Sequence, residues 1–290
     1  MAEARIGISG WRYPNWRRSF YPTGLRQADE LAYASERMTS IEVNGSFYSL
    51  QRPANWVRWH DATPDGFVFA VKGPRFITHI KRLGDIRAPL ANFFASGVLA
   101  LGSKLGPVLW QLPPNLGFDP EVADRFLGLL PRTTTDAAAL AAGHDERMEG
   151  KSWFDAAAIV DRPLRYAVEV RHPEFEDRQE EWANLLARHG VASVTADTAG
   201  RYPRIDRTTA DFAYARLHGE EELYASGYDE ASLDRWATWA WTHLDAGRDA
   251  FLYFDNDVKV RAPFDAMALI ARFPRPAGLP EAPTAEPPGH

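Results

Sequence analysis

The chain has 290 residues and no cysteine, which excludes disulfides, thiolate metal sites, iron–sulfur clusters and a cysteine nucleophile. The 33 Lys and Arg residues against 39 Asp and Glu residues leave a net charge of −6, which disfavours a protein that coats itself in nucleic acid. No stretch approaches the ~18 consecutive apolar residues of a membrane helix, and residues 1–9 lack the apolar core of a signal peptide. We therefore expect a cytoplasmic protein with no membrane partner.

Eight short β-prone runs alternate with segments of helical periodicity. The runs lie at residues 5–9, 40–44, 67–72, 108–112, 166–170, 191–196, 212–217 and 250–254. Eight strands that alternate with helices predict a parallel sheet, and eight is the number that closes a (β/α)8 TIM-type barrel. The alternative is an open doubly wound sheet. The sequence GISGW at residues 7–11 is not the Gly-rich phosphate turn of that fold, so we predict the barrel.

Three of the helical segments have clear boundaries. In the segment at residues 118–130, Asp119 can cap the helix, Pro120 suits its first position, and the apolar residues fall on one face. Residues 177–189 and 229–246 have the same one-sided pattern, and each ends before a glycine. These segments are predicted to form the outer layer of the barrel.

The sequence predicts one domain followed by a tail. We assign residues 1–274 to the barrel, with an Ala-rich excursion at residues 133–162 between the fourth and fifth strands. Residues 275–290 are rich in proline and contain little that could pack, so they are predicted to be a disordered tail.

Charged residues occur late in four of the predicted strands. Alternation along each strand points Glu42, Lys72, Glu169 and Arg216 into the barrel. The carboxyl ends of the strands form the mouth where barrel enzymes place their chemistry. An unpaired buried charge costs several kcal/mol, so these residues must pair with one another or with a ligand. The alternative is an internal salt-bridge network that only stabilises the barrel.

Aromatic and polar residues follow most strands, as expected for the walls of a ligand pocket. The candidate catalytic residues are Glu42, Glu169, Lys72 and His218. The candidate substrate-binding residues are Trp11, Tyr13, Asn44, Phe47, Tyr48, Arg75, His79, Gln111, Arg171, His172, Arg216, Asn256 and Asp257.

Six sequence motifs occur in order between residues 5 and 272. They are GWRYPNW at 10–16, IEVNGSFY at 41–48, FVFAVKGPRFITH at 67–79, LWQLPP at 109–114, EVRH at 169–172 and RLHG at 216–219. In content and order they resemble the motifs of the YecE-like family of unknown function, number seventy-two in its series. The resemblance implies a TIM-type barrel and supplies no reaction.

Our first hypothesis is an enzyme with acid–base chemistry of the hydrolase, isomerase or lyase type, acting on a small substrate that carries phosphate or carboxylate. Glu42 and Glu169 would be the general acid and base. The anion would be held by Lys72, Arg75, Arg171 and Arg216. Two carboxylates also suit glycoside hydrolysis, but a neutral sugar gives the inner cations nothing to pair with. No cofactor is expected.

Two other functions remain open. The first is a metal-dependent phosphodiesterase or a nucleic-acid-processing barrel, with ligands from Glu42, Glu169, Asp197, His218 and Asp257. The sequence contains no H-x-H or H-E-x-x-H motif, and the inner cations would repel a metal, so none is predicted. The second is a non-catalytic ligand-binding module, because a pocket does not by itself prove turnover.

Overall fold

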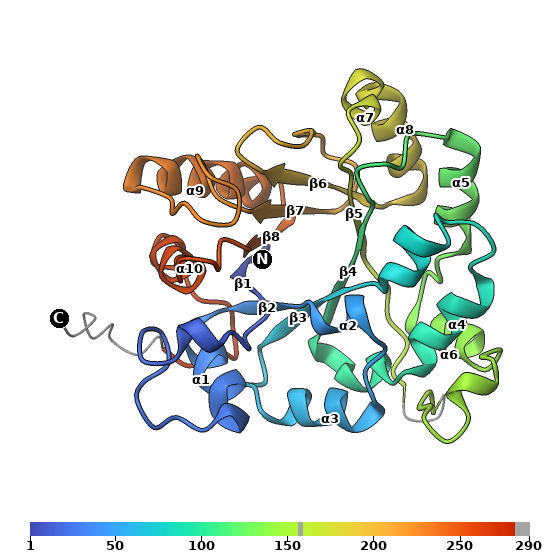
Figure 1. Ribbon diagram of the computed structural model, residues 1–290, viewed down its shortest axis with the longest axis horizontal. Coiled ribbons are helices and arrows are strands. Elements are labelled where there is room, and N and C mark those ends of the chain that lie inside the picture. Colours follow the sequence, from blue (N-terminus) through green and yellow to red (C-terminus); the bar gives the residue numbers. More distant parts are fainter. Residues whose placement is uncertain (156–158, 282–290) are drawn as a thin grey trace.

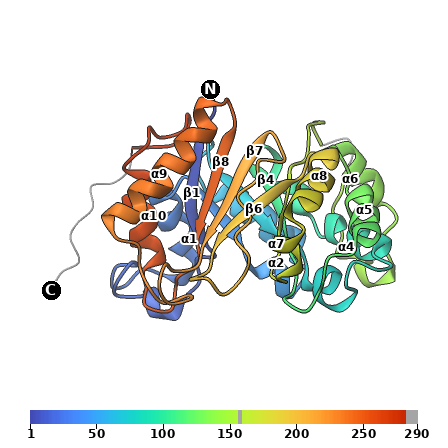
Figure 2. The ribbon, with the colours of Figure 1, turned by 90° about the horizontal axis from the view of Figure 1, so that it is seen from above.

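The computed structural model describes residues 1–155 and 159–281, and its eight strands close into a parallel barrel (Figures 1 and 2). The strands are β1 (Ala4–Ser9), β2 (Ser40–Val43), β3 (Val68–Lys72), β4 (Leu105–Gln111), β5 (Tyr166–Glu169), β6 (Ala192–Asp197), β7 (Phe212–Leu217) and β8 (Asp249–Phe254). Each strand pairs with the next, and β8 pairs with β1. The predicted (β/α)8 barrel is confirmed, because an open sheet would leave two edge strands unpaired.

Helices surround the barrel. They are α1 (Glu30–Arg37), α2 (Gly45–Tyr48), α3 (Pro53–Asp61), α4 (Arg87–Ala95), α5 (Pro120–Leu129), α6 (Thr134–Ala141), α7 (Glu174–Asp177), α8 (Gln179–His189), α9 (Glu230–Asp245) and α10 (Ala262–Ile270). In Figure 1, α9 and α10 lie on the side opposite α4, α5 and α6. None of the helices in the described ranges is both long and apolar enough to cross a membrane.

The helix boundaries follow the capping chemistry of the sequence. The Asp119 carboxylate accepts hydrogen bonds from the first backbone N–H groups of α5, and Asp229 does the same for α9. Gly190 ends α8 in the left-handed conformation, with a φ of 62°. These three helices agree with the predicted segments to within two residues.

Strand side chains alternate between an outer and an inner layer. The outer residues pack against the helices and form the main core, which includes Ile41 and Val43. The inner residues form a second apolar cluster of Ala70, Leu109, Ala167, Ala192, Val194, Ala196, Phe212, Tyr214, Phe251 and Tyr253. Glu42, Lys72 and Arg216 continue this inner set toward the carboxyl ends, as the alternation predicts. The barrel is therefore filled with apolar side chains below a charged mouth.

The described parts of the excursion, residues 133–155 and 159–162, join the outer layer of the barrel. Its helix α6 packs against α4, and the Trp153 N–H donates to the Ala95 carbonyl at 2.8 Å. Asn92 on α4 accepts a hydrogen bond from the Asp145 N–H at 3.0 Å. The excursion thus thickens the wall next to β3 and β4.

The proline-rich segment begins in contact with the barrel. The Arg275 guanidinium donates to the Glu36 carbonyl at 3.0 Å, the Gly66 N–H donates to the Gly278 carbonyl at 3.3 Å, and Leu279 packs against the core. These residues belong to the segment that was predicted to be disordered from residue 275. The remainder of that prediction, at residues 282–290, lies outside the described residues.

A close approach between β1 and β2 provides a test of the barrel packing. A Cβ atom on Gly7 would lie 1.7 Å from the Ser40 carbonyl oxygen, so Gly7→Ala requires the backbone to move. We expect it to lower the free energy of unfolding by about 3 kcal/mol, as overpacked cores do. Gly128→Ala in α5 is the control: its Cβ would meet its nearest atom at 4.0 Å, and we expect a gain of about 0.5–1 kcal/mol. Equal urea midpoints for the Gly7 variant and the wild type would contradict the packing.

Candidate active site

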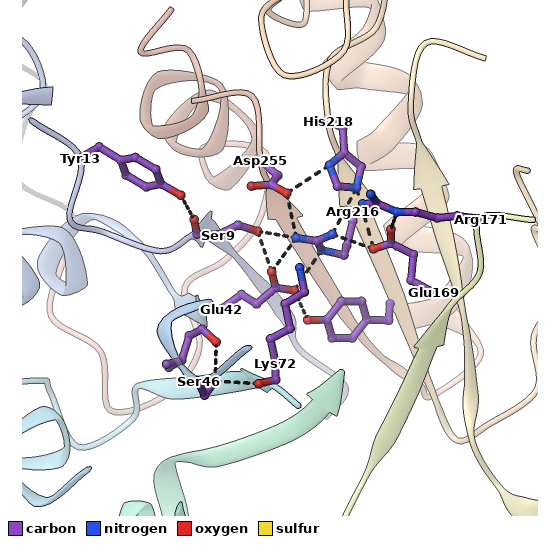
Figure 3. A network of polar contacts seen from close by, with 12 residues as sticks. Ser9, Tyr13, Glu42, Ser46, Lys72, Glu169, Arg171, Arg216, His218 and Asp255 are labelled. Atoms are coloured by element: carbon purple, nitrogen blue, oxygen red, sulfur yellow. Dashed lines mark hydrogen bonds and ion pairs between the residues drawn. The ribbon is translucent and has the colours of Figure 1, made fainter. Parts of the chain in front are cut away.

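The inner charges meet around Arg216, near the carboxyl end of the strand β7 (Figure 3). Its guanidinium is fully buried and donates to Glu42 Oε1 at 2.8 Å, Glu169 Oε2 at 2.6 Å and Asp255 Oδ2 at 2.8 Å. Burial alone would lower the pKa of Arg216, but the three carboxylates hold it well above its ordinary value. The planar fork of five N–H donors allows one arginine to bind three acceptors.

Both carboxylate oxygens of Glu42 accept hydrogen bonds from neighbouring side chains. Its carboxylate accepts hydrogen bonds from Ser9 Oγ at 2.8 Å and Tyr214 Oη at 2.6 Å, and from two nitrogens of Arg216 at 2.8 and 3.1 Å. The side chain is completely buried. Glu42 therefore orients Arg216 and does not face the opening of the barrel.

Glu169 is held in its charged form. Arg171 Nε donates to its Oε1 at 2.8 Å, and Arg216 occupies its Oε2. Burial would raise the pKa of Glu169, but Arg171 and Arg216 outweigh burial and hold that pKa well below its usual range. A general acid or base works best with a pKa near the operating pH. The geometry consequently does not favour Glu42 and Glu169 as the acid–base pair that the sequence suggested.

His218 bridges Arg216 and Asp255. Its Nε2 lies 3.3 Å from Arg216 Nη1, and its Nδ1 lies 3.1 Å from Asp255 Oδ2. A guanidinium can only donate, so Nε2 accepts and the ring proton is on Nδ1, facing the carboxylate. Burial and Arg216 lower the pKa of His218, which keeps the ring neutral. Burial would raise the pKa of Asp255, but Arg216 and His218 lower it to about 2.

Lys72 differs from the other inner charges. It ends β3 with a side chain that is 7% exposed, and no hydrogen bond or ion pair from the described residues reaches its Nζ. The ammonium lies 4.4 Å from the centroid of the Phe47 ring. Burial and Arg216 lower the pKa of Lys72 to about 8. Lys72 is thus an inner cation with no carboxylate bound to it.

The Phe47 ring also contacts His79, edge to face, at 5.1 Å. Burial and the charge of Lys72 lower the pKa of His79 to about 4, so this ring is neutral at pH 7. Phe47 and His79, both predicted as binding residues, therefore lie beside Lys72 as an uncharged wall.

A pocket of about 330 Å³ opens beside the network, after β1 and β2. Its walls include four of the predicted binding residues, Trp11, Tyr13, Asn44 and Tyr48. Tyr13 Oη donates to the Ser9 carbonyl at 2.6 Å, which connects this pocket to the neighbourhood of Glu42.

Three further predicted residues lie at or near the mouth. Gln111 is buried at the end of β4, where the register pairs it with Glu169. Asp257 follows β8, and burial together with Asp255 raises its pKa to about 6. Arg75 is exposed, immediately before the π-helical turn Phe76–Ile80. None of the three contacts Arg216 directly.

Two predicted binding residues support the loops. His172 Nδ1 accepts a hydrogen bond from the Glu174 N–H at 3.3 Å at the start of α7. Asn256 is fully buried, and its amide donates to the Ser226 carbonyl at 2.9 Å and to Asp265 Oδ2 at 2.8 Å. We assign Asn256 to bracing the loop after β7 against α10. The neighbouring Asp255, which was not among the candidates, is the residue that joins the network.

Three of the residues that were considered as metal ligands, Glu42, Glu169 and His218, meet around Arg216 and not around a metal site. Within residues 1–155 and 159–281, no group of three or more His, Asp or Glu side chains is arranged to hold a metal ion. The oxygens of Glu42 and Glu169 are occupied by arginine, and Asp197 interacts with Tyr228 at the end of β6.

Fold and site together define a TIM-type barrel with a buried arginine–carboxylate network at the carboxyl ends of its strands. The chain belongs to the family described as "Protein of unknown function DUF72", which matches residues 5–288. This confirms the YecE-like resemblance found in the motifs.

Relatives and solved structures agree with this assignment. The UPF0759 protein YecE of Escherichia coli K12 is 28% identical over 196 residues, which cover 67% of this chain and 58% of that protein. YunF of Bacillus subtilis strain 168 is 30% identical over 115 residues, 38% of this chain and 39% of that protein. The match thus spans less than two thirds of either relative.

Two crystal structures of DUF72 family proteins share the fold. The protein from Thermotoga maritima superposes with a TM-score of 0.71 at 23% identity and covers 92% of this chain and 97% of its own. The protein from Enterococcus faecalis superposes with a TM-score of 0.65 at 12% identity and covers 93% of this chain and 96% of its own. At these identities the likeness shows the architecture alone.

Removing Arg216 tests the network. Arg216→Met leaves three buried carboxylates without their shared cation, so we expect the free energy of unfolding at pH 7 to fall by about 3–5 kcal/mol. The exposed Arg125→Met on α5 is the control, with an expected change within about 0.5 kcal/mol.

The effect of Arg216→Met should also depend on pH. In the wild type, the low pKa values of Glu169 and Asp255 stabilise the fold above pH ~4, and this contribution is lost toward pH ~2. Urea titrations should therefore show the two proteins converging as the pH falls; a gap that stays constant would contradict the assignment.

Substitution of Lys72 should affect the stability of the fold in the opposite way to substitution of Arg216. At pH 7 the Lys72 side chain is largely buried, and no hydrogen bond from the described residues holds its ammonium, so Lys72→Met should unfold at the same urea concentration as the wild type or at a higher one. From pH ~8 to ~10.5 the unfolded chain still holds the proton that folded Lys72 has lost, so wild-type stability should rise relative to the variant. Measurements at pH 7 and 10 check this sign. A marked loss of stability in Lys72→Met at pH 7 would make Lys72 a structural member of the network.

Proposed function

We propose that this protein is an enzyme that binds a small phosphate- or carboxylate-bearing substrate at the mouth of the barrel and transfers a proton through Lys72. The observation that carries the proposal is the ammonium of Lys72, which has no hydrogen bond or ion pair among the described residues, whereas Glu42, Glu169 and Asp255 are each bound by Arg216. An anionic group would supply the counter-charge that the protein does not.

The protonation state of Lys72 suits acid–base chemistry. With a pKa of about 8, about a tenth of the molecules carry the neutral amine at pH 7. Loss of the proton makes Lys72 a base, and the more abundant ammonium form is an acid. This role replaces the one that the sequence suggested for Glu42 and Glu169.

Arg171 is the second cation available to the substrate. Its Nε binds Glu169, its guanidinium lies 4.7 Å from the Tyr202 ring, and its side chain is 10% exposed. A planar guanidinium has donors left for phosphate or carboxylate oxygens. Arg216 is sealed from solvent, so it contributes through the electrostatic field and through the positions of Glu169 and Asp255.

The phosphodiesterase and nucleic-acid alternatives gain less support. A metal-dependent mechanism would need carboxylate oxygens that arginine now occupies. On the rim, Lys81 pairs with Asp85 at 3.3 Å and Arg82 donates to the Asn115 carbonyl at 2.9 Å, which leaves these cations partly engaged. A small anion therefore fits the mouth better than a polyanion.

Ligand binding tests the proposal. A thermal-shift panel of phosphorylated and carboxylated metabolites, followed by calorimetry, should identify compounds that bind the wild type. We expect Lys72→Met to lose at least about tenfold in affinity, because a charge-assisted hydrogen bond contributes roughly 1.5–3 kcal/mol. Lys81→Met, on the rim, should keep wild-type affinity.

Turnover separates an enzyme from a binding module. For a substrate that the panel identifies, kcat/KM should rise with a pKa near 8 if Lys72 acts as the base, and Lys72→Arg should bind the substrate without turning it over. Equal affinity in the wild type and Lys72→Met would overturn the anion site, whereas binding without turnover would favour the binding module.

A further inference from the structure

The pocket beside the network has aromatic walls from separate segments of the chain. Trp11 and Tyr13 follow β1, Tyr48 ends α2 and Trp59 belongs to α3. Trp11 and Trp59 contact each other edge to face at 5.1 Å, so their two rings form one corner of the pocket wall. Tyr48 is 72% exposed, so its ring is open to contact with another molecule.

The pocket lies next to the inner charges. The Phe47 ring is 5.1 Å from the Tyr48 ring and 4.4 Å from the Lys72 ammonium, so one aromatic ring separates the pocket wall from the cation. Tyr13 Oη donates to the Ser9 carbonyl at 2.6 Å, and Ser9 Oγ donates to Glu42 Oε1 at 2.8 Å, so this wall of the pocket adjoins the network. The pocket and the cation are therefore neighbours, with the Phe47 ring between them.

Polar atoms of the pocket-lining residues lack partners. Asn44 Oδ1 and Trp59 Nε1 are both buried, and neither has a hydrogen-bond partner among the described residues. The Nε1 atoms of four other tryptophans are buried without a partner in the same way, so the Trp59 donor does not by itself mark a ligand, and the buried Asn44 acceptor is the feature specific to this pocket.

We propose that this pocket binds the flat face of a ring, aromatic or sugar, in a substrate whose phosphate or carboxylate reaches Lys72. Aromatic side chains stack on the faces of both kinds of ring. A pocket of about 330 Å³ is large enough for one such ring. The proposal names the substrate class of the proposed function and rests on that function for its anionic end.

Calorimetry with matched ligands tests the ring pocket. The phosphate series is methyl phosphate, phenyl phosphate and glucose 6-phosphate, and the carboxylate series is acetate, benzoate and glucuronate. In at least one series a ring compound should bind about tenfold more tightly than the ringless one, the size typical of one stacking contact. The aromatic and sugar members of each series distinguish the two kinds of ring.

A substitution isolates the contribution of the ring. Tyr48→Ala should remove the advantage of the ring compound and leave the affinity for methyl phosphate or acetate unchanged, because Tyr48 is exposed and does not contact Lys72. Phe76→Ala is the matched control: Phe76 is also an exposed aromatic residue, on a neighbouring turn but outside this pocket, and the variant should keep the full advantage.

The possible failures are distinguishable. Anions that bind equally well with and without a ring would overturn the ring pocket and leave the anion site intact. Ring compounds that bind as tightly to Lys72→Met as to the wild type would overturn the link between the pocket and Lys72. No binding in either series would overturn the ring pocket together with the proposed function.

Discussion

The carboxyl end of this barrel depends on one buried guanidinium. Arg216 binds Glu42, Glu169 and Asp255 at once, and without it these largely buried carboxylates would lose their shared cation. Because the partners come from β2, β5 and the end of β8, the interaction also ties together distant parts of the barrel wall. The arrangement combines the two interpretations that the sequence left open, since a stabilising network lies inside a mouth that retains an uncommitted cation.

The network also sets the charge states of the inner residues. Glu169 and Asp255 are poor proton donors, because Arg216 helps to hold the pKa values of these two carboxyl groups below their usual range. Lys72 shares the buried environment but not the hydrogen bonds, so burial moves its pKa toward neutrality instead. The same low-polarity surroundings thus fix the charge of the network and make the charge of one lysine variable.

Much of the site was predictable from strand parity alone. Alternation with period two correctly placed Glu42, Lys72, Glu169 and Arg216 inside the barrel and late in their strands. Asp255 was missed, although the same alternation from Phe251 and Tyr253 points to it; the loop motif drew attention to Asn256 and Asp257 instead. The sequence could not show that Asn256 braces a loop and is not a binding residue, because its hydrogen-bond partners Ser226 and Asp265 lie far from it along the chain.

The sequence by itself determined the eight strands, their direction, the inward-facing charges and the family. These properties follow from local periodicity, capping residues and short motifs, which the chain carries in its order. Only the tertiary structure decided which charge pairs with which, because distances between the ends of separate strands depend on how the barrel closes. That closure saturates Glu42 and Glu169, leaves Lys72 unpaired, and brings Trp11, Tyr48 and Trp59 around one pocket.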